Sequence, residues 1–221
     1  MTRSETSSET SSDTWRDIAD ETALAELLGE PTAAARGKER DALTDVDRDW
    51  LASSPFCMLA TADADGRCDV SPKGDPAGRL VHVLDDRTLA IAERPGNRRA
   101  DGYRNILANP QVGLNFLIPG RGDTLRVNGR ARLVSDAPFF DAMVVKGHRP
   151  LLAVVVEVET VFFHCAKAFL RSQLWQPESW EPEARVPRRA VLAQRLERPD
   201  DSLEELDAYY GPSYEERLYV P

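Results

Sequence analysis

The sequence is poor in the residues that build disulfide frameworks and metal clusters. Its 221 residues include three cysteines, Cys57, Cys68 and Cys165, with no C-x-x-C spacing. Neither a disulfide scaffold nor a zinc ribbon is therefore predicted. The three histidines occur singly along the chain and indicate no metal site. We expect reduced thiols in a cytoplasmic protein without a bound metal.

Long apolar runs and the common nucleotide and nucleophile motifs are missing too. No stretch approaches the roughly 20 apolar residues that span a bilayer, and the N-terminus lacks the basic start and apolar run of a signal peptide. The chain contains no G-x-G-x-x-G, no P-loop and no G-x-S-x-G. A net charge of −9 argues against nucleic acid and anionic membranes as partners.

The composition changes near residue 53. Residues 1–12 are polar and of low complexity, which predicts a disordered tail. Residues 13–52 predict a helical extension, with a first helix from its N-cap Asp13 to Gly29 and a second that begins at Thr44. We expect the main domain at 53–175, followed by a C-terminal extension at 176–221.

Short apolar runs separated by tight turns fill the main domain. They lie at 56–61, 67–71, 80–84, 88–92, 112–118, 124–134 and 151–163, with helices expected at 101–108 and 138–145. Turns rich in Asp, Gly and Pro join several of them as hairpins. At least six short strands joined in this way favour a mainly β fold with flanking helices, an antiparallel barrel or sandwich.

A basic cluster in this acidic chain is the strongest chemical signal. The stretch E-R-P-G-N-R-R-A-D-G-Y-R-N at 93–105 holds four arginines, Arg94, Arg98, Arg99 and Arg104. With Asn97 as helix cap, the helix N-terminus and the guanidinium groups would suit a phosphate. The alternative is a solvated helix face whose arginines pair with neighbours such as Asp101.

A second candidate is D-V-S-P-K-G-D at 69–75, which predicts a strand that opens into a loop. Lys73 would neutralise a phosphate or reach an electron-rich ring, and Ser71 would hydrogen-bond a planar heterocycle. The alternative is a plain turn in which Lys73 pairs with Asp69 or Asp75.

A third candidate covers residues 165–175. If this stretch is helical, Lys167, Arg171 and Trp175 share one face. Two cations and an indole suit an anionic or aromatic ligand. The alternative is a core helix whose cations snorkel to the surface.

The order of six motifs carries a family resemblance. They are S-P-F-C-M-L-A-T at 54–61, D-V-S-P-K-G-D at 69–75, E-R-P-G-N-R-R-A-D at 93–101, N-P-Q-V-G-L-N-F at 109–116, L-R-V-N-G-R-A at 125–131 and H-C-A-K-A-F-L-R-S-Q-L-W at 164–175. In this order they resemble the flavin-binding split-barrel family related to pyridoxamine 5′-phosphate oxidase. The last two resemble a bacterial branch known only as FMN-binding proteins.

The resemblance implies a six-stranded antiparallel split β-barrel that forms a homodimer with FMN at the subunit interface. One chain would place Val70, Ser71 and Lys73 along the isoalloxazine ring and Asn97, Arg98 and Arg99 at the phosphate. The other chain would contribute the remaining cofactor-binding residues, Thr124, Arg126, Arg171, Ser172 and Trp175. The extension at 176–221 would pack on the barrel or on the dimer partner.

The resemblance also implies an FMN-binding oxidoreductase that acts on a small molecule, with the flavin performing the electron or hydride transfer. It implies no particular catalytic side chain. The C-terminal Arg-x-His signature of the true oxidase is missing, because the chain reads Arg217-Leu218-Tyr219 there, so vitamin B6 oxidation is not expected. The alternative is a sensor or storage module that binds flavin, a deazaflavin or haem without turnover.

Overall fold

The computed structural model describes residues 15–180 and 186–219. The expected disordered tail at 1–12 and the expected N-cap Asp13 lie outside these residues. The chain divides into two compact units, residues 1–38 and 39–221. The second unit holds the sheet and every candidate site residue. Among the described residues, no helix is both long and apolar enough to cross a membrane.

The first unit contains two short helices, α1 (Glu21–Leu28) and α2 (Ala33–Arg36). The predicted helix from residue 13 is wrong in its start, because residues 15–19 are not helical. Asp20 caps α1 instead, its side chain accepting a hydrogen bond from the Ala23 amide at 2.8 Å. An aspartate at this position satisfies a helix amide that would otherwise lack a partner, so it sets the start of the helix.

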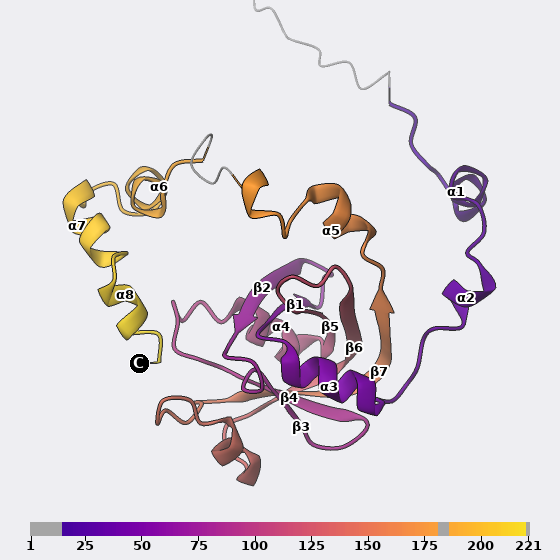
Figure 1. Ribbon diagram of the computed structural model, residues 1–221, viewed down its shortest axis with the longest axis horizontal. Coiled ribbons are helices and arrows are strands. Elements are labelled where there is room, and N and C mark those ends of the chain that lie inside the picture. Colours follow the sequence, from indigo (N-terminus) through magenta and orange to yellow (C-terminus); the bar gives the residue numbers. More distant parts are fainter. Residues whose placement is uncertain (1–14, 181–185, 220–221) are drawn as a thin grey trace, which may run out of the picture. The chain divides into compact units, whose positions relative to one another are not determined.

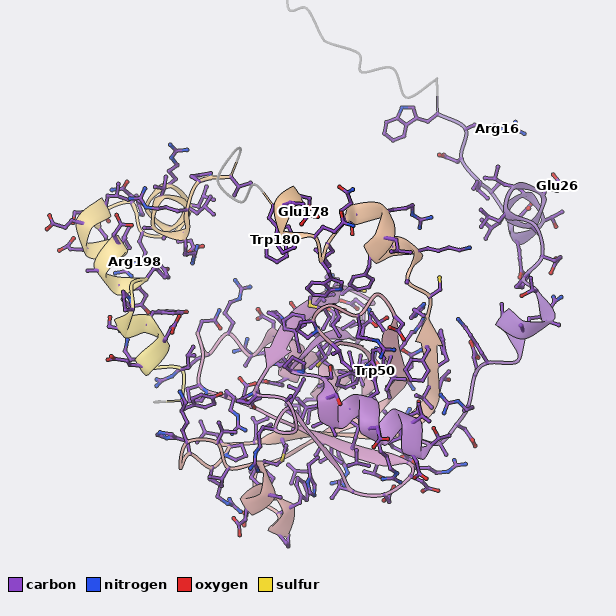
Figure 2. All side chains as sticks on the ribbon, viewed as in Figure 1. Arg16, Glu26, Trp50, Glu178, Trp180 and Arg198 are labelled. Carbon is purple, nitrogen blue, oxygen red and sulfur yellow. The ribbon has the colours of Figure 1, made fainter. Side chains whose placement is uncertain are left out.

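The second predicted helix is confirmed as α3 (Asp45–Ser53). Thr44 and Asp47 form a capping box, in which each side chain accepts from the other residue's backbone amide. Trp50 and Leu51 on the inner side of α3 are buried in the main core. Figure 2 labels Trp50 within the densely packed side chains over the sheet. α3 is thereby fixed to the sheet.

The sheet of the second unit has seven antiparallel strands, which are labelled in Figure 1. They are β1 (Phe56–Ala62), β2 (Cys68–Gly74), β3 (Val81–Val83), β4 (Thr88–Ala92), β5 (Gln111–Leu117), β6 (Thr124–Val134) and β7 (Ala153–His164). Their order is β2-β1-β5-β6-β7-β4-β3. The family resemblance implies six strands, whereas the described residues form seven, because the run at 80–84 forms β3 and pairs with β4. The edge strands β2 and β3 do not pair, an open arrangement consistent with a split barrel.

Alternating burial along the strands gives the sheet two distinct faces. Side chains such as Leu59, Leu114, Phe116 and Val127 point inward and form the main core. On the opposite face of β4 and β7, a second apolar cluster packs under the 3₁₀ helix η2 (Pro138–Met143), the segment predicted as a helix at 138–145. The outward face of β1, β5 and β6 carries no such cover among the described residues.

One predicted loop and one predicted helix differ from the structure. The segment at 69–75 does not open into a loop, because β2 continues through Pro72 to Gly74. An edge strand tolerates proline, since the missing amide hydrogen can face away from the neighbouring strand. The helix α4 (Asp101–Ala108) forms as predicted. The helix in 165–175 is shorter, because α5 (Lys167–Ser172) ends at Gln173, which has a positive φ of 53°.

The C-terminal extension is helical. It contains the 3₁₀ turn η3 (Pro177–Ser179) and three helices, α6 (Arg189–Leu196), α7 (Leu203–Tyr209) and α8 (Ser213–Glu216). α6 and α7 bury a small apolar cluster of Ala190, Ala193 and Leu206. Tyr219, beyond α8, hydrogen-bonds Asp75. The extension therefore contacts the loop that follows β2.

Candidate functional site

Five of the candidate cofactor-binding residues line one cavity of about 220 Å³. Ser71 and Lys73 come from the inward side of β2, and Asn97, Arg98 and Arg99 from the loop before α4. Because successive side chains of a strand point to opposite faces of the sheet, Val70 lies on the opposite side of β2 from Ser71. Val70 therefore does not line this cavity. The chain thus brings together the two segments that the sequence singled out separately.

A partly buried polar network lines this cavity. Lys73 Nζ donates to Glu93 Oε2 at 3.0 Å and to the Tyr103 hydroxyl oxygen at 2.6 Å. The Tyr103 hydroxyl in turn donates to Glu93. Burial, followed by this contact with the Glu93 carboxylate, raises the pKa of Tyr103, which stays protonated. The expected pairing of Lys73 with Asp69 or Asp75 is wrong, because β2 continues as a strand and directs Lys73 across to Glu93.

The loop before α4 has an unusual backbone. Arg98 and Ala100 have φ values of 60° and 59°, a left-handed conformation that non-glycine residues adopt infrequently. Asn97 does not cap α4; its Oδ1 accepts from the Arg99 amide at 3.1 Å, and Ala100 occupies the cap position without a side-chain bond. The prediction for Asn97 was wrong because two left-handed residues insert an extra turn between it and the helix. Such strain is typical of functional loops.

The charges of the cavity are partly neutralised within the chain. Arg99 Nε lies 2.7 Å from Asp101 Oδ2, and Arg104 also contacts Asp101. These ion pairs are the ones expected if the arginines lie on a solvated helix face. Lys73 is paired with Glu93. Arg98 has no ion pair among the described residues. An anion entering the cavity would meet one unpaired guanidinium and two cations shared with carboxylates.

Behind the cavity, Arg94 forms a separate buried cluster. Its Nε donates to Asp75 Oδ2 at 2.7 Å and its Nη2 to the Met143 carbonyl oxygen at 2.7 Å, while its Nη1 is buried without a hydrogen-bond partner. The Tyr219 hydroxyl donates to the other Asp75 oxygen at 2.9 Å. Arg94 is therefore a structural residue that joins the base of the loop to the end of β2.

The remaining candidates from the barrel lie on the outward face of the sheet. Val70, Thr124 and Arg126 all belong to this face, which has a shallow cavity of about 320 Å³ lined by Arg126, Asn115 and residues of β1, β5 and β6. Arg126 Nε donates to Asn128 Oδ1 at 3.2 Å. The amide oxygen of Asn115 is buried but has no hydrogen-bond partner. A buried acceptor without a partner is rare in proteins and is the kind of atom that a ligand or a second chain satisfies.

Of the three residues predicted to share one helix face, Lys167 and Arg171 lie four residues apart in α5 and do so, but Trp175 does not. Arg171 and Ser172 close α5, whereas Trp175 lies beyond it, its Nε1 donating to the Arg121 carbonyl oxygen at 2.6 Å. Ser172 Oγ donates back to the Phe169 carbonyl oxygen. No described cavity unites these three residues with the β2 cavity. Their role would require a second chain.

Sequence reasoning missed Tyr103, Asp75 and Tyr219, and did not single out Glu93. Glu93 and Tyr103 lie ten residues apart at the two ends of the basic stretch, which was the available signal. Asp75 and Tyr219 are 144 residues apart, and nothing local relates them. Cys57, opposite Lys73 in the β1–β2 ladder, is buried, and burial raises its pKa to about 12.

Comparison with known proteins finds several solved structures to which the chain is similar. Among solved structures the chain is similar to a Lactobacillus delbrueckii protein named as a candidate pyridoxamine 5′-phosphate oxidase, with 27% identity, 57% of this chain and 98% of that chain covered, and a TM-score of 0.44. HupZ from Group A Streptococcus is 22% identical, with 55% and 93% covered and a TM-score of 0.44. HutZ, the haem storage protein of Vibrio cholerae, is 15% identical, with 53% and 89% covered and a TM-score of 0.39.

No curated protein matches the chain. The family model described as pyridoxamine 5′-phosphate oxidase matches residues 43–165. This span contains β1 to β7, the loop before α4 and the whole β2 cavity. Because the match covers more than half of the sequence, the chain belongs to the pyridoxamine 5′-phosphate oxidase family.

Proposed function

We propose that the protein is a cytoplasmic, FMN-binding flavoprotein that catalyses the oxidation or reduction of a small molecule. The observation that carries the proposal is the convergence of Ser71, Lys73, Asn97, Arg98 and Arg99 on one cavity in a chain of this family. FMN, when bound, supplies the hydride or electron transfer. The protein's own residues then have to bind, orient and shield it.

The donor set of the cavity fits the phosphate end of FMN. Three cationic side chains, Lys73, Arg98 and Arg99, line the cavity. Guanidinium groups commonly bind phosphate through charge-assisted hydrogen bonds. Arg98 would bind it directly, and Arg99 would divide its donors between the phosphate and Asp101. Ser71 would hydrogen-bond the polar edge of the flavin ring. Lys73, held by Glu93 and Tyr103, would keep its ammonium group at a fixed place.

The size of the cavity supports a homodimer. At about 220 Å³ it lies below the roughly 300–1,000 Å³ typical of small-molecule sites, so one chain offers part of a site for FMN. The outward face of β1, β5 and β6, with its unsatisfied Asn115 oxygen, would meet a second chain. Thr124, Arg126 and the Arg171–Trp175 segment of that chain would then complete the site.

The absorption spectrum of the purified protein tests the proposal directly. We expect a yellow protein whose flavin is released on denaturation, with one FMN per chain. A colourless protein that takes up no added FMN would overturn the proposal. Titration with FMN and a deazaflavin in competition identifies the preferred cofactor.

The placement of the phosphate has its own test. Replacing both Arg98 and Arg99 with Ala should abolish flavin retention, because the cavity then loses two of its three cations. Arg36→Ala with Arg195→Ala is the matched control, since it removes the same charge from exposed positions outside the sheet. Unchanged retention in the R98A/R99A protein would refute the placement.

A second candidate is a module that holds a cofactor without turnover. The outward cavity is lined by Met58 and His164, side chains of the types that ligate haem iron in other proteins. If the protein binds haem or a flavin that no tested reductant, NADH and NADPH included, can reduce, this second function is favoured. Reduction of the bound flavin within the time of a catalytic cycle favours the oxidoreductase.

A further inference from the structure

A second, larger cavity lies on the other side of the loop before α4. It has a volume of about 370 Å³, within the range typical of small-molecule sites. One wall is the Glu93–Arg98 stretch, which also lines the β2 cavity, and the other comes from the C-terminal extension. None of the residues proposed to contact the flavin ring lines it.

The cavity carries positive charge that the chain does not neutralise. Arg98 enters it from the loop and Arg217 from the segment after α8, and neither has an ion pair among the described residues. Glu93, the one carboxylate among the lining residues, is occupied by Lys73 and Tyr103. In a chain of net charge −9, two unpaired guanidinium groups at one cavity attract an anion.

Arg217 is held in place before any ligand arrives. Its Nε donates to the Ser213 carbonyl oxygen at 3.2 Å and its Nη2 to the Tyr209 carbonyl oxygen at 3.0 Å. Its guanidinium carbon lies 4.7 Å from the centre of the Tyr209 ring and 6.0 Å from that of Tyr214. Two of its five N–H donors are thus used, and three remain for a carboxylate.

Four further lining residues are aromatic or aliphatic and exposed. Tyr209, Tyr214, Leu151 and Leu218 are between 40% and 65% exposed, which leaves flat apolar surface beside the guanidinium groups. Exposed apolar side chains gathered around fixed charges mark ligand sites in soluble proteins. A ring would pack on this surface while its charged group contacts Arg217 and Arg98.

We propose that this cavity binds a small organic anion, a carboxylate carried on a flat apolar ring, at a site beside the cofactor cavity with which it shares Arg98. Benzoate is the probe, titrated into the purified protein by calorimetry. We expect one site per chain. Acetate, which has the charge without the ring, and benzyl alcohol, which has the ring without the charge, should bind at least about tenfold more weakly.

Variants of two lining residues test the location. Arg217→Gln and Leu151→Glu should each weaken benzoate binding at least about tenfold, the second because it places a negative charge beside the carboxylate. Leu151 lies outside the C-terminal extension and does not line the cofactor cavity, so L151E keeps the test valid if R217Q disturbs the C-terminal helices. Arg195→Gln, an exposed arginine of α6 outside the cavity, should leave it unchanged. So should Arg99→Gln, because Arg99 lines the cofactor cavity and not this one, and its ion pair is with Asp101.

Three results would overturn the proposal. They are acetate binding as tightly as benzoate, unchanged benzoate affinity in both R217Q and L151E, and loss of benzoate binding in R99Q, which would place the probe in the cofactor cavity. A protein that binds no FMN but shows the expected benzoate pattern would leave this site standing and refute only the flavin.

Discussion

At the scale of single residues, one buried carboxylate joins three distant parts of the chain. The Asp75 side chain is 1% exposed and accepts from Arg94, which begins the basic loop, and from Tyr219, near the C-terminus. The Tyr219 ring also lies 5.5 Å from Lys146 Nζ. Asp75 follows the strand that carries Ser71 and Lys73, so it holds both walls of the cofactor cavity at their base.

Asp75→Asn should therefore destabilise the protein strongly. The change leaves the Arg94 guanidinium, whose side chain is 12% exposed, without its counter-charge, and breaking a buried ion pair costs about 3–5 kcal/mol. Urea unfolding measures the loss. Asp65→Asn, which removes an exposed partner of Arg67, should cost less than about 1 kcal/mol, and equal losses in the two variants would contradict the assignment.

Tyr219→Phe removes only the hydrogen bond that the Tyr219 hydroxyl donates to Asp75. Removing one hydroxyl that donates to a carboxylate should cost about 1.5–3 kcal/mol, without changing the shape of the ring. Tyr214→Phe serves as the control, because the Tyr214 hydroxyl makes no hydrogen bond with the part of the chain that the structure describes. Faster proteolysis of the C-terminal extension in Y219F than in Y214F would support the contact, and identical rates would speak against it.

At the scale of elements, α3 depends on its capping residues. Asp47 is fully buried and accepts from Arg40 Nη2 at 2.9 Å and from the Thr44 amide at 2.7 Å. Burial alone would raise the pKa of Asp47, but the Arg40 and Thr44 hydrogen bonds outweigh it and hold the pKa below its usual value. The contribution of this cap to stability should therefore be lost in acid, when Asp47 is protonated.

The direction of this shift sets the pH dependence. A carboxyl with a lowered folded-state pKa contributes stability above its unfolded pKa of about 3.9, and the contribution is lost as the pH falls through the lower folded value. Asp47→Asn should flatten the slope of unfolding free energy against pH in the window just below about pH 3.9. Urea unfolding at stepped pH measures it, and an unchanged slope would show that Asp47 does not contribute.

The irregularity between β6 and β7 requires a glycine. The register shifts between Asn128 and Gly129, and a Cβ on Gly129 would lie 1.9 Å from the Glu157 carbonyl oxygen. Gly129→Ala should cost about 1–3 kcal/mol or more through strain, as measured by thermal unfolding. Gly96→Ala, whose nearest atom lies at 4.0 Å, should change the stability little; similar losses in both would mean that the bulge relaxes.

Elements defined by local signals were predictable, and contacts between distant segments were not. Thr44 with Asp47, and the apolar run of β4, carry their structure in adjacent residues, so both were placed correctly. Asn97 was misassigned as a cap because the left-handed residues Arg98 and Ala100 have no sequence signature. The Lys73–Glu93–Tyr103 network depends on how β2 packs beside the loop. The meeting of β2 with that loop was predicted through the family resemblance, not through residue spacing.

At the scale of the whole molecule, the outward face of β1, β5 and β6 should hold two chains together. Ala60 lies on this face and lines its shallow cavity. Ala60→Glu should raise the dimer dissociation constant at least about hundredfold, because it buries a charge without a partner. Leu107→Glu, at a position of α4 that is 76% exposed, is the control. Sedimentation velocity measures both, and a monomeric parent protein would refute the dimer outright.

The proline in the edge strand β2 has a consequence beyond the site. An unpaired strand edge is a template on which further strands of other copies can add, the first step of amyloid-like growth. Pro72, in the middle of β2, offers no amide hydrogen to an incoming strand and interrupts the row of donors. The residue that stands between Ser71 and Lys73 therefore also protects the protein against aggregation at the concentrations of a crowded cell.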